Sequence, residues 1–220
     1  MKGLLIKDIR LLAGQKHTLL VIFVIGAIFA VTQEQPELLI GYVMMVMSML
    51  AITSISYDEF DNGMPFLMTL PSGRSGYVKE KYLLTAIIVT VAYATSNTMI
   101  FLLGQFNKNS ESWDVRWNLQ FSFIFAVVML LMLYTLIPII LKVGVEKGRI
   151  AQFGIFGIIF LVGYMGSNII EKMDLDLSKI TEFFNSMSKT LMICICMCLL
   201  SIYTILSYLI SKRIVENKDF

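Results

Sequence analysis

The sequence predicts an all-α, polytopic membrane protein that forms a single domain over residues 1–220. Six helices are expected to cross the bilayer, with one helix on the membrane surface before the first span and a short helix outside the membrane between the second and third. Hydrophobic residues make up 57% of the chain and charged residues 15%, whereas soluble domains carry about 25% charged residues. The mean hydropathy is +0.75, and the charged side chains gather between apolar runs. These observations exclude an ordinary soluble domain.

Residues 1–16 have the pattern of an amphipathic helix that lies along the membrane surface. Leu5 and Ile9 share an apolar side, while Arg10 lies on the opposite side, where anionic headgroups would meet it. Asp8 falls near the apolar side and breaks the pattern. Either it has a partner there or it reaches the interface by itself, and the sequence leaves both interpretations open.

Six apolar runs are expected to span the bilayer, and the charged stretches between them would lie in water. The predicted spans are residues 18–32, 38–56, 82–103, 119–141, 150–170 and 190–210. The first run is short for a span, so tilt or local thinning of the bilayer would complete it. A cleaved signal peptide is the rival interpretation, but the long, patterned leading segment and the further spans favour a retained helix.

Two groups of residues inside the spans are candidates for a substrate cavity. The second span carries closely spaced methionines, whose soft side chains adapt to varied apolar cargo. The third carries an amide among several hydroxyl groups, and such side chains face other helices or a wet cavity. The candidates are Met44, Met45, Met47 and Asn97. For the methionines, ordinary packing or lipid contact is the favoured alternative.

The fifth span carries small residues at Gly154, Gly157 and Gly163. Small residues on one side of a helix let another helix approach closely. That helix would come from the same chain or from a second copy. The cysteines of the sixth span, between residues 194 and 198, are expected to be packing residues, because they lie in one apolar run with no loops for a disulfide framework to join.

Lysine and arginine are distributed unevenly when the six spans are threaded in order. Thirteen of the 18 fall on the side that holds the N-terminal segment, the stretch 57–81, the turn 142–149 and the C-terminal tail. Short cytoplasmic loops carry the excess of positive charge in membrane proteins. Both termini and the stretch 57–81 are therefore expected to face the cytoplasm.

The stretch 57–81 is too charged to lie in hydrocarbon, where each acid or base would cost about 2.5 to 3.5 kcal/mol. Asn62 and Gly63 signal a helix start, Pro65 is tolerated in a first helical turn, and Pro71 disfavours helix beyond Leu70. A helix this short is unstable alone in water, so its apolar face should dock on something. Another protein is the favoured interpretation. The alternatives are a solvated loop end for the acids and insertion of the apolar side chains into the membrane surface.

Motifs of the common nucleotide, hydrolase and metal sites are missing from the sequence. The nearest approach to a P-loop, Gly144 to Arg149, lacks the second half of that motif. No H-E-x-x-H or G-x-S-x-G occurs, His17 is the single histidine, and a net charge of +2 is too small to indicate nucleic acid. The span cores carry no carboxylate relay. The chain is therefore not expected to be an enzyme or to bind a metal or cofactor, and as a transporter it would need an external energy source.

Three short stretches give the sequence a specific resemblance. They are Lys2-Gly-Leu-Leu-Ile-Lys-Asp8, then Asp58 to Met64, and then Thr69 to Tyr82. They resemble the permease subunits of ABC-2-type exporters, and most of all the small bacterial group that exports peptides, including the phenol-soluble modulins of staphylococci, or confers bacitracin resistance. The six-span layout matches along the full chain, while the motif content is confined to these stretches.

This resemblance implies a permease that works with a separate ATPase. Residues 1–16 would be an interfacial elbow helix, and Asn62 to Leu70 a coupling helix seated in a groove of a cytosolic ATPase subunit, which would bind ATP and Mg²⁺. Two permeases and two ATPases in the bacterial plasma membrane would export an amphipathic or hydrophobic substrate of peptide type. The other interpretation is a membrane scaffold or immunity protein that binds a peptide or partner without transport. The residues expected to contact the ATPase are Asp58, Glu59, Phe60, Asp61, Asn62, Gly63, Met64, Phe66 and Leu67.

Overall fold

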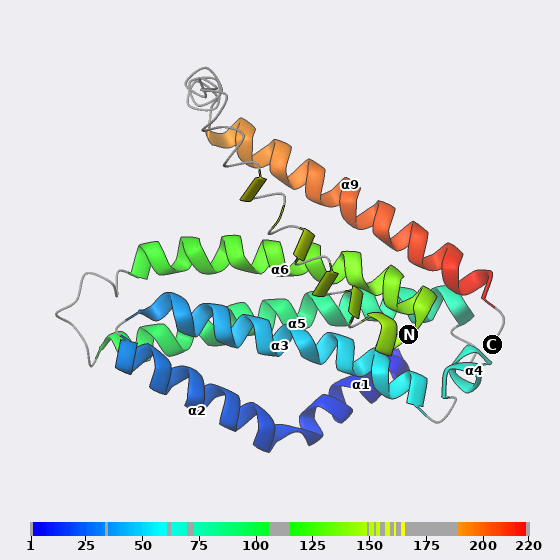
Figure 1. Ribbon diagram of the computed structural model, residues 1–220, viewed down its shortest axis with the longest axis horizontal. Coiled ribbons are helices and arrows are strands. Elements are labelled where there is room, and N and C mark those ends of the chain that lie inside the picture. The colour runs from blue at the N-terminus through cyan, green and yellow to red at the C-terminus, as the bar shows by residue number, and fades with distance from the viewer. Residues whose placement is uncertain are drawn as a thin grey trace.

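The computed structural model describes residues 2–33, 35–60, 63–69, 73–105, 115–148 and 189–218, together with residues 150, 151, 153, 154, 157, 158, 161, 164 and 165. The elements in this part of the chain are helices (Figure 1). They are α1 (Lys2–Gly14), α2 (Lys16–Gln33), α3 (Pro36–Glu59), α4 (Gly63–Met68), α5 (Gly73–Gly104), α6 (Val115–Val143) and α9 (Lys189–Glu216). The all-helical class is thus confirmed for the described residues.

Four described helices are long and apolar enough to cross a membrane: Pro36–Glu59, Gly73–Gly104, Arg116–Val143 and Cys198–Glu216. A fifth is reached only if α1 and α2 count as one bent span, since Lys2–Gly14 and Leu19–Phe29 meet at 60°. The six predicted spans are therefore not all found in the described part. The predicted first span lies in α2, and the predicted fifth, residues 150–170, falls mostly outside the described residues.

Local sequence signals account for several helix ends. Pro36 occupies the first turn of α3, where its missing N–H is not needed. Gly144 follows α6 with a φ of +88°, and its N–H donates to the carbonyl of Ile140 at 2.8 Å. A positive φ at the residue after a helix suits glycine, which lacks a Cβ. Gly144 therefore ends α6.

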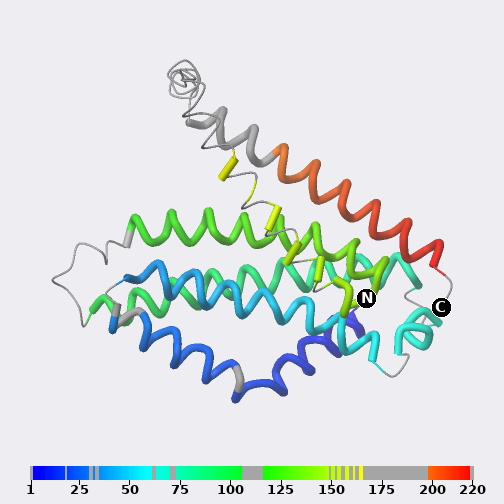
Figure 2. Tube along the Cα trace, viewed as in Figure 1, coloured from blue at the N-terminus to red at the C-terminus, as the bar shows by residue number. Residues whose placement is uncertain are grey.

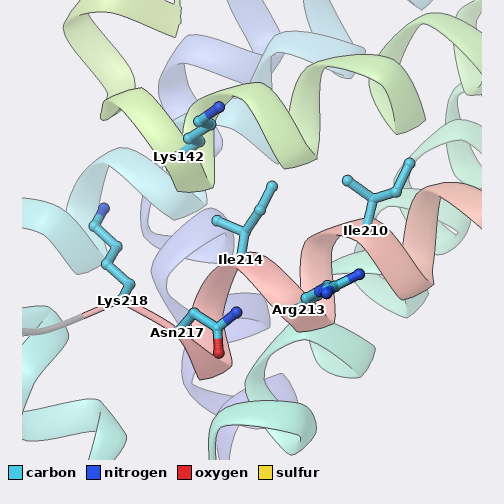
Figure 3. Close-up of a pocket in the computed structure, with 6 residues that line it drawn as sticks. All are labelled: Lys142, Ile210, Arg213, Ile214, Asn217 and Lys218. Atoms are coloured by element: carbon cyan, nitrogen blue, oxygen red, sulfur yellow. The ribbon is translucent and has the colours of Figure 1, made fainter.

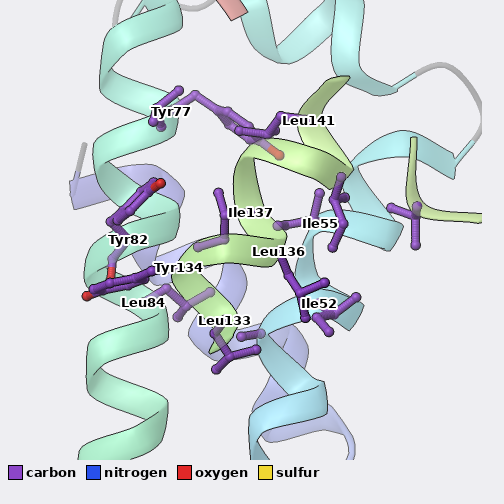
Figure 4. Packing of buried hydrophobic residues seen from close by; sticks show 14 of the residues in the cluster. Ile52, Ile55, Tyr77, Tyr82, Leu84, Leu133, Tyr134, Leu136, Ile137 and Leu141 are labelled. Atoms are coloured by element: carbon purple, nitrogen blue, oxygen red, sulfur yellow. The ribbon is translucent and has the colours of Figure 1, made fainter. Parts of the chain in front are cut away.

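Helix α3 is the centre of the bundle and packs against α2, α5 and α6. Two apolar clusters surround it. One lies toward the start of α3 and contains Leu39, Ile40, Val43, Met44 and Met47 with Ala92 and Ile100 of α5. The other lies toward the end of α3 and includes Ile52 and Ile55, which face Tyr77 and Leu84 of α5 and Leu136 of α6 (Figure 4).

Buried hydroxyl groups join three helices inside this second cluster. Tyr82 of α5 exchanges hydrogen bonds with Ser207 at 2.6 Å and Ser211 at 2.8 Å, both of α9. Tyr134 of α6 donates to the backbone carbonyl of Tyr82 at 3.3 Å, and the two rings lie 4.8 Å apart. Polar groups in a membrane protein find partners on neighbouring helices because lipid offers none. These bonds fix the register of α5, α6 and α9.

One end of the bundle gathers the short elements and both chain ends. Figures 1 and 2 show α1, α4, the end of α3, the start of α5, the end of α9 and the two labelled termini there, and we call it the α4 end. Helix α5 has 32 residues, or about 48 Å at 1.5 Å per residue, against about 30 Å of hydrocarbon. Its charged first turns, residues 73–81, therefore extend beyond the membrane at the α4 end. The sequence had these residues in a loop, whereas the structure continues the helix through them.

Candidate functional site

The short helix α4 stands at the α4 end between α3 and α5. Its residues Met64 and Leu67 are each only 9% exposed and belong to the apolar cluster around the end of α3. After its last turn, the side chain and N–H of Thr69 both donate to the carbonyl of Phe66, at 2.7 and 3.2 Å. A six-residue helix does not persist alone in water, so this packing is what keeps α4 folded.

The position of α4 also depends on a close approach between two backbones. A Cβ added to Gly63 would lie 2.9 Å from the carbonyl oxygen of Asp58. Backbone cannot yield at that distance as a flexible side chain can. Glycine at position 63 therefore allows α4 to begin directly against the end of α3.

The opposite side of this region presents aromatic side chains to the surroundings. Phe60 is 73% exposed and Phe66 is 69% exposed. Phe60 also lines a groove of about 450 Å³ together with Glu59 and the segment 143–147 that follows α6. Glu59 shapes this groove, because its carboxylate accepts a hydrogen bond from the N–H of Val145 at 2.7 Å.

Beneath α4, a buried ionic cluster joins α1, α3 and α5. Lys81 of α5 lies 2.6 Å from Asp58 at the end of α3, forms an ion pair with Asp8 of α1, and donates to Ser54 at 2.7 Å. Lys7 pairs with Asp58 and lies 3.0 Å from Asp8. The side chains of Lys81, Asp8 and Asp58 are at most 4% exposed. Because removal of one partner from a buried ion pair costs about 3–5 kcal/mol, this cluster strongly favours one arrangement of the three helices.

Two neutral hydroxyl groups complete the cluster. Ser54 of α3 donates to Asp8 at 2.8 Å, and Tyr77 of α5 donates to Asp58 at 3.1 Å. The ring of Tyr77 also lies 5.2 Å from the ammonium group of Lys81. Hydrogen bonds to a charged carboxylate are stronger than those between neutral groups. The two hydroxyls therefore add charge-assisted hydrogen bonds to the carboxylates of Asp8 and Asp58.

Glu80 adds a third acid to the cluster. Its carboxylate lies 3.6 Å from Lys81, and within the described residues neither of its buried oxygens has a hydrogen-bond partner. Burial raises the pKa of Glu80, and the positive charge of Lys81 opposes that rise. The negative charges of Asp8 and Asp58 raise the pKa further, to about 7. Glu80 lies in the early turns of α5, and its raised pKa favours the protonated form.

The sequence matches the family described as ABC-2 family transporter protein over residues 3–216. That match covers the helices described above except for Lys2, the first residue of α1. The chain belongs to the ABC-2 transporter family. It is therefore a transmembrane subunit of an ABC transporter, a multi-pass protein of the plasma membrane that works with a partner ATPase subunit. No curated protein and no solved structure shows a significant match to the chain.

The structure divides the predicted ATPase-contacting residues of this ABC-2 protein into two groups. Phe60 and Phe66 face outward, whereas Met64 and Leu67 are packed inside. Asp58 forms ion pairs within the chain with Lys7 and Lys81. Glu59 is likewise bound, to Val145, and Asp61 and Asn62 lie outside the described residues.

The substrate-cavity candidates are not brought together. Met44 and Met47 are buried in the apolar cluster near the start of α3, while Met45 is 43% exposed. The amide of Asn97 accepts a hydrogen bond from Ser122 at 3.0 Å and so joins α5 to α6. Met44 and Met47 are therefore packing residues, which was the favoured alternative to a cavity lining in the sequence analysis.

The glycines of the predicted fifth span are only partly described. Gly154 and Gly157 are exposed, and a Cβ added to either would meet nothing within 4 Å. Gly163 lies outside the described residues. No described neighbour in the same chain therefore needs glycine at positions 154 and 157.

The ionic cluster is the part of the site that sequence reasoning missed. Asp8 gave a signal, since it is an acid on the apolar side of an amphipathic helix, and it proves to be fully buried. Lys81 gave none, because a lysine beside Lys79 and Glu80 reads as part of a solvated loop. Only the meeting of the middle of α1, the end of α3 and the early turns of α5 turns these residues into partners.

Proposed function

We propose that this ABC-2 protein is the membrane subunit of an exporter, and that α4 is its coupling helix, seated in a groove of the cytosolic ATPase subunit. The observation that carries the proposal is the two-sided character of α4. Leu67 and Met64 are anchored in the bundle, while Phe66 is 69% exposed. Large exposed apolar side chains next to charged ones mark protein interaction sites.

The groove beside Phe60 extends this docking surface. It is open, has a volume of about 450 Å³, and includes Glu146 and Lys147 among its lining residues. Its mixed lining suits a contact with charged side chains at the edge of an ATPase groove. Asp61 and Asn62, between Phe60 and α4 in sequence, would contribute to the same contact.

The ionic cluster supplies a route for force from α4 into the membrane. Asp58 and Lys81 lie on the two helices that flank α4. Lys7 of α1 pairs with Asp58, and Asp8 of α1 pairs with Lys81. A displacement of α4 by the ATPase would move the end of α3 and the start of α5 together, because separating them would leave buried charges unpaired. ATP and Mg²⁺ would be bound by the ATPase and not by this chain.

The resemblance to peptide exporters supports the proposed direction and cargo of transport, and the charge distribution supports the proposed orientation. The excess of lysine and arginine supports a cytoplasmic position for the α4 end. Two copies of the chain, meeting at the exposed Gly154 and Gly157, would form a homodimer with two ATPases. An amphipathic or hydrophobic peptide would leave the cytoplasm or inner leaflet along this dimer interface.

The test is a purification of the full chain in mild detergent, followed by assay of vanadate-sensitive ATP hydrolysis and identification of the bound ATPase. Phe66→Glu places a charge on the docking face, so we expect it to weaken ATPase binding at least about tenfold, as loss of an interface anchor does. Phe66→Leu keeps an apolar side chain at the same position. It should retain the ATPase and most of the hydrolysis.

Two outcomes would oppose the proposal. If Phe66→Glu keeps the ATPase and its hydrolysis rate, α4 is not the coupling helix. If the unaltered chain carries no ATPase subunit and a labelled amphipathic peptide binds it without ATP-dependent movement, the scaffold or immunity function is the better account.

A further inference from the structure

A basic cavity lies between the C-terminal ends of α6 and α9, apart from the docking surface. It has a volume of about 430 Å³ and is lined by Lys142, Ile210, Arg213, Ile214, Asn217 and Lys218. Figure 3 shows Lys142 on α6 and the other five on α9 and the residues directly after it. Three of the six lining residues are cationic, and none of them is acidic.

The helix ends offset only part of this positive charge. Lys142 is in the last turn of α6 and Arg213 is in the last turn of α9. A helix C-terminus carries a partial charge of about −0.5, so two of them offset roughly one of the three cations. Glu216, the nearest acid along α9, is 3.7 Å from Lys212, which is not a lining residue. Among the described residues that line the cavity, the positive charge therefore exceeds what the two helix ends offset.

One of the cations is held in place. The ammonium group of Lys218 donates to the carbonyl of Leu141 at 2.9 Å, which fixes it over the final turn of α6 and beside Lys142. Lys218 therefore joins the segment after α9 to α6 and closes one side of the cavity. A charge held in this way loses little further freedom when an anion arrives.

The cavity continues an apolar surface of α9. Along this helix, Ile202, Ile205, Leu206, Leu209 and Ile210 are between 52% and 57% exposed, as suits a face in contact with acyl chains. Ile210 and Ile214 carry that face into the cavity, and Figure 3 shows both projecting from α9 toward α6. The cationic side chains come at the end of this apolar strip, where the hydrocarbon gives way to water.

We propose that this cavity binds an anionic phospholipid through its headgroup phosphate. Arg213 and Lys142 would hold the phosphate, since a guanidinium group presents paired donors to phosphate oxygens and an ammonium group adds a point charge. Ile210 and Ile214 would contact the glycerol and the first carbons of the acyl chains. Basic pockets between transmembrane helices are where such headgroups bind. Coupling to an ATPase is not needed for this binding.

The test measures lipid retention by native mass spectrometry on the full chain in detergent, titrated with phosphatidylglycerol or phosphatidylcholine. We expect clear preference for phosphatidylglycerol, and a loss of about ten- to thirtyfold in its affinity in the double variant Lys142→Gln, Arg213→Gln, because each cation near a lipid surface contributes favourably. The matched control is Lys79→Gln, Lys147→Gln, which removes the same charge from two exposed positions outside the cavity and should retain the preference.

A conservative variant and a competition experiment distinguish phosphate recognition from a simple charge effect and a lipid from a free phosphate compound. The single variant Arg213→Lys keeps the charge but loses the paired donors, so it should bind less tightly than the unaltered chain and more tightly than the double variant. Soluble glycerol phosphate should not displace the lipid. Displacement at low millimolar concentration would assign the cavity to a free phosphate compound and overturn the lipid assignment. Equal losses of phosphatidylglycerol affinity in the double variant and its control would also overturn it.

Discussion

At the scale of single residues, Glu80 is the acid whose environment is least favourable to its charge. Three acids, Asp8, Asp58 and Glu80, meet the two lysines Lys7 and Lys81 in the buried cluster. Asp8 and Asp58 hold the close contacts with both lysines, and Glu80 keeps only the pairing at 3.6 Å. One negative charge is therefore poorly compensated, and it falls on Glu80.

Glu80→Gln should change stability in a pH-dependent way. The pKa of Glu80 is about 7 in the folded protein, above its ordinary value of 4.5. The folded state therefore binds the proton more tightly, and stability declines as pH rises through this window. We expect Glu80→Gln to match the unaltered protein at pH 5 and to be more stable at pH 8, by about 1–3 kcal/mol.

Thermal unfolding in detergent at the two pH values measures this effect. Glu146→Gln removes an exposed acid after α6 and serves as the control, with little effect expected at either pH. An equal change from Glu80→Gln at pH 5 and pH 8 would contradict a proton on Glu80.

At the scale of elements, α4 has one face for stability and another for a partner. Leu67 belongs to the apolar cluster with Tyr77 and Val78 of α5, whereas Phe66 is mostly exposed. Adjacent positions on a helix point about 100° apart, which lets a six-residue helix serve both purposes. The cost is dependence on the bundle, since α4 has too few residues to fold without it.

Leu67→Ala should therefore lower stability, whereas Phe66→Ala should weaken binding of the partner. Loss of a buried leucine costs about 2–5 kcal/mol, so Leu67→Ala should lower the unfolding temperature measurably. Phe66→Ala removes an exposed ring and should leave stability within about 0.5 kcal/mol, while it weakens binding of the ATPase subunit. Unfolding temperature and ATPase retention, measured on the same preparations, separate the two. Equal loss of stability in both variants would contradict the two-sided assignment of α4.

At the scale of the whole molecule, the exposed glycines indicate where a second copy would meet this one. Gly154 and Gly157 are both in helical conformation and face open space. Ile158 is the next residue, is 62% exposed, and points in another direction. A homodimer formed through the glycine side would bring the two copies of Gly157 into close contact.

Gly157→Cys should then cross-link two copies in membranes under mild oxidation, in a background that lacks the three native cysteines. A disulfide needs Cα atoms within about 7 Å, so efficient cross-linking requires close helix contact. Ile158→Cys is the control and should cross-link poorly. Non-reducing gel electrophoresis gives the measurement, and stronger cross-linking at position 158 than at 157 would place the interface elsewhere.

The sequence alone predicted the fold class, the start of α4 and the family of this protein. Hydropathy and the spacing of charges indicated helices in a membrane, because the cost of placing charge in hydrocarbon acts on each segment separately. Gly63 and Pro65 marked the start of α4, and the observed helix Gly63–Met68 falls within the predicted Asn62 to Leu70. The family was also indicated by a few short stretches, and the match over residues 3–216 supports it.

Tertiary structure alone decided which charges are buried. Lys81 and Asp58 looked like solvated residues of a loop, and Asp8 had two open interpretations, yet all three form one buried cluster. Their pairing depends on the middle of α1, the end of α3 and the early turns of α5 meeting, over sequence separations of 51 residues for Lys7 with Asp58 and 73 for Asp8 with Lys81. Helix periodicity and hydropathy are local properties, whereas the environment of a charge is set by whatever the rest of the chain brings against it.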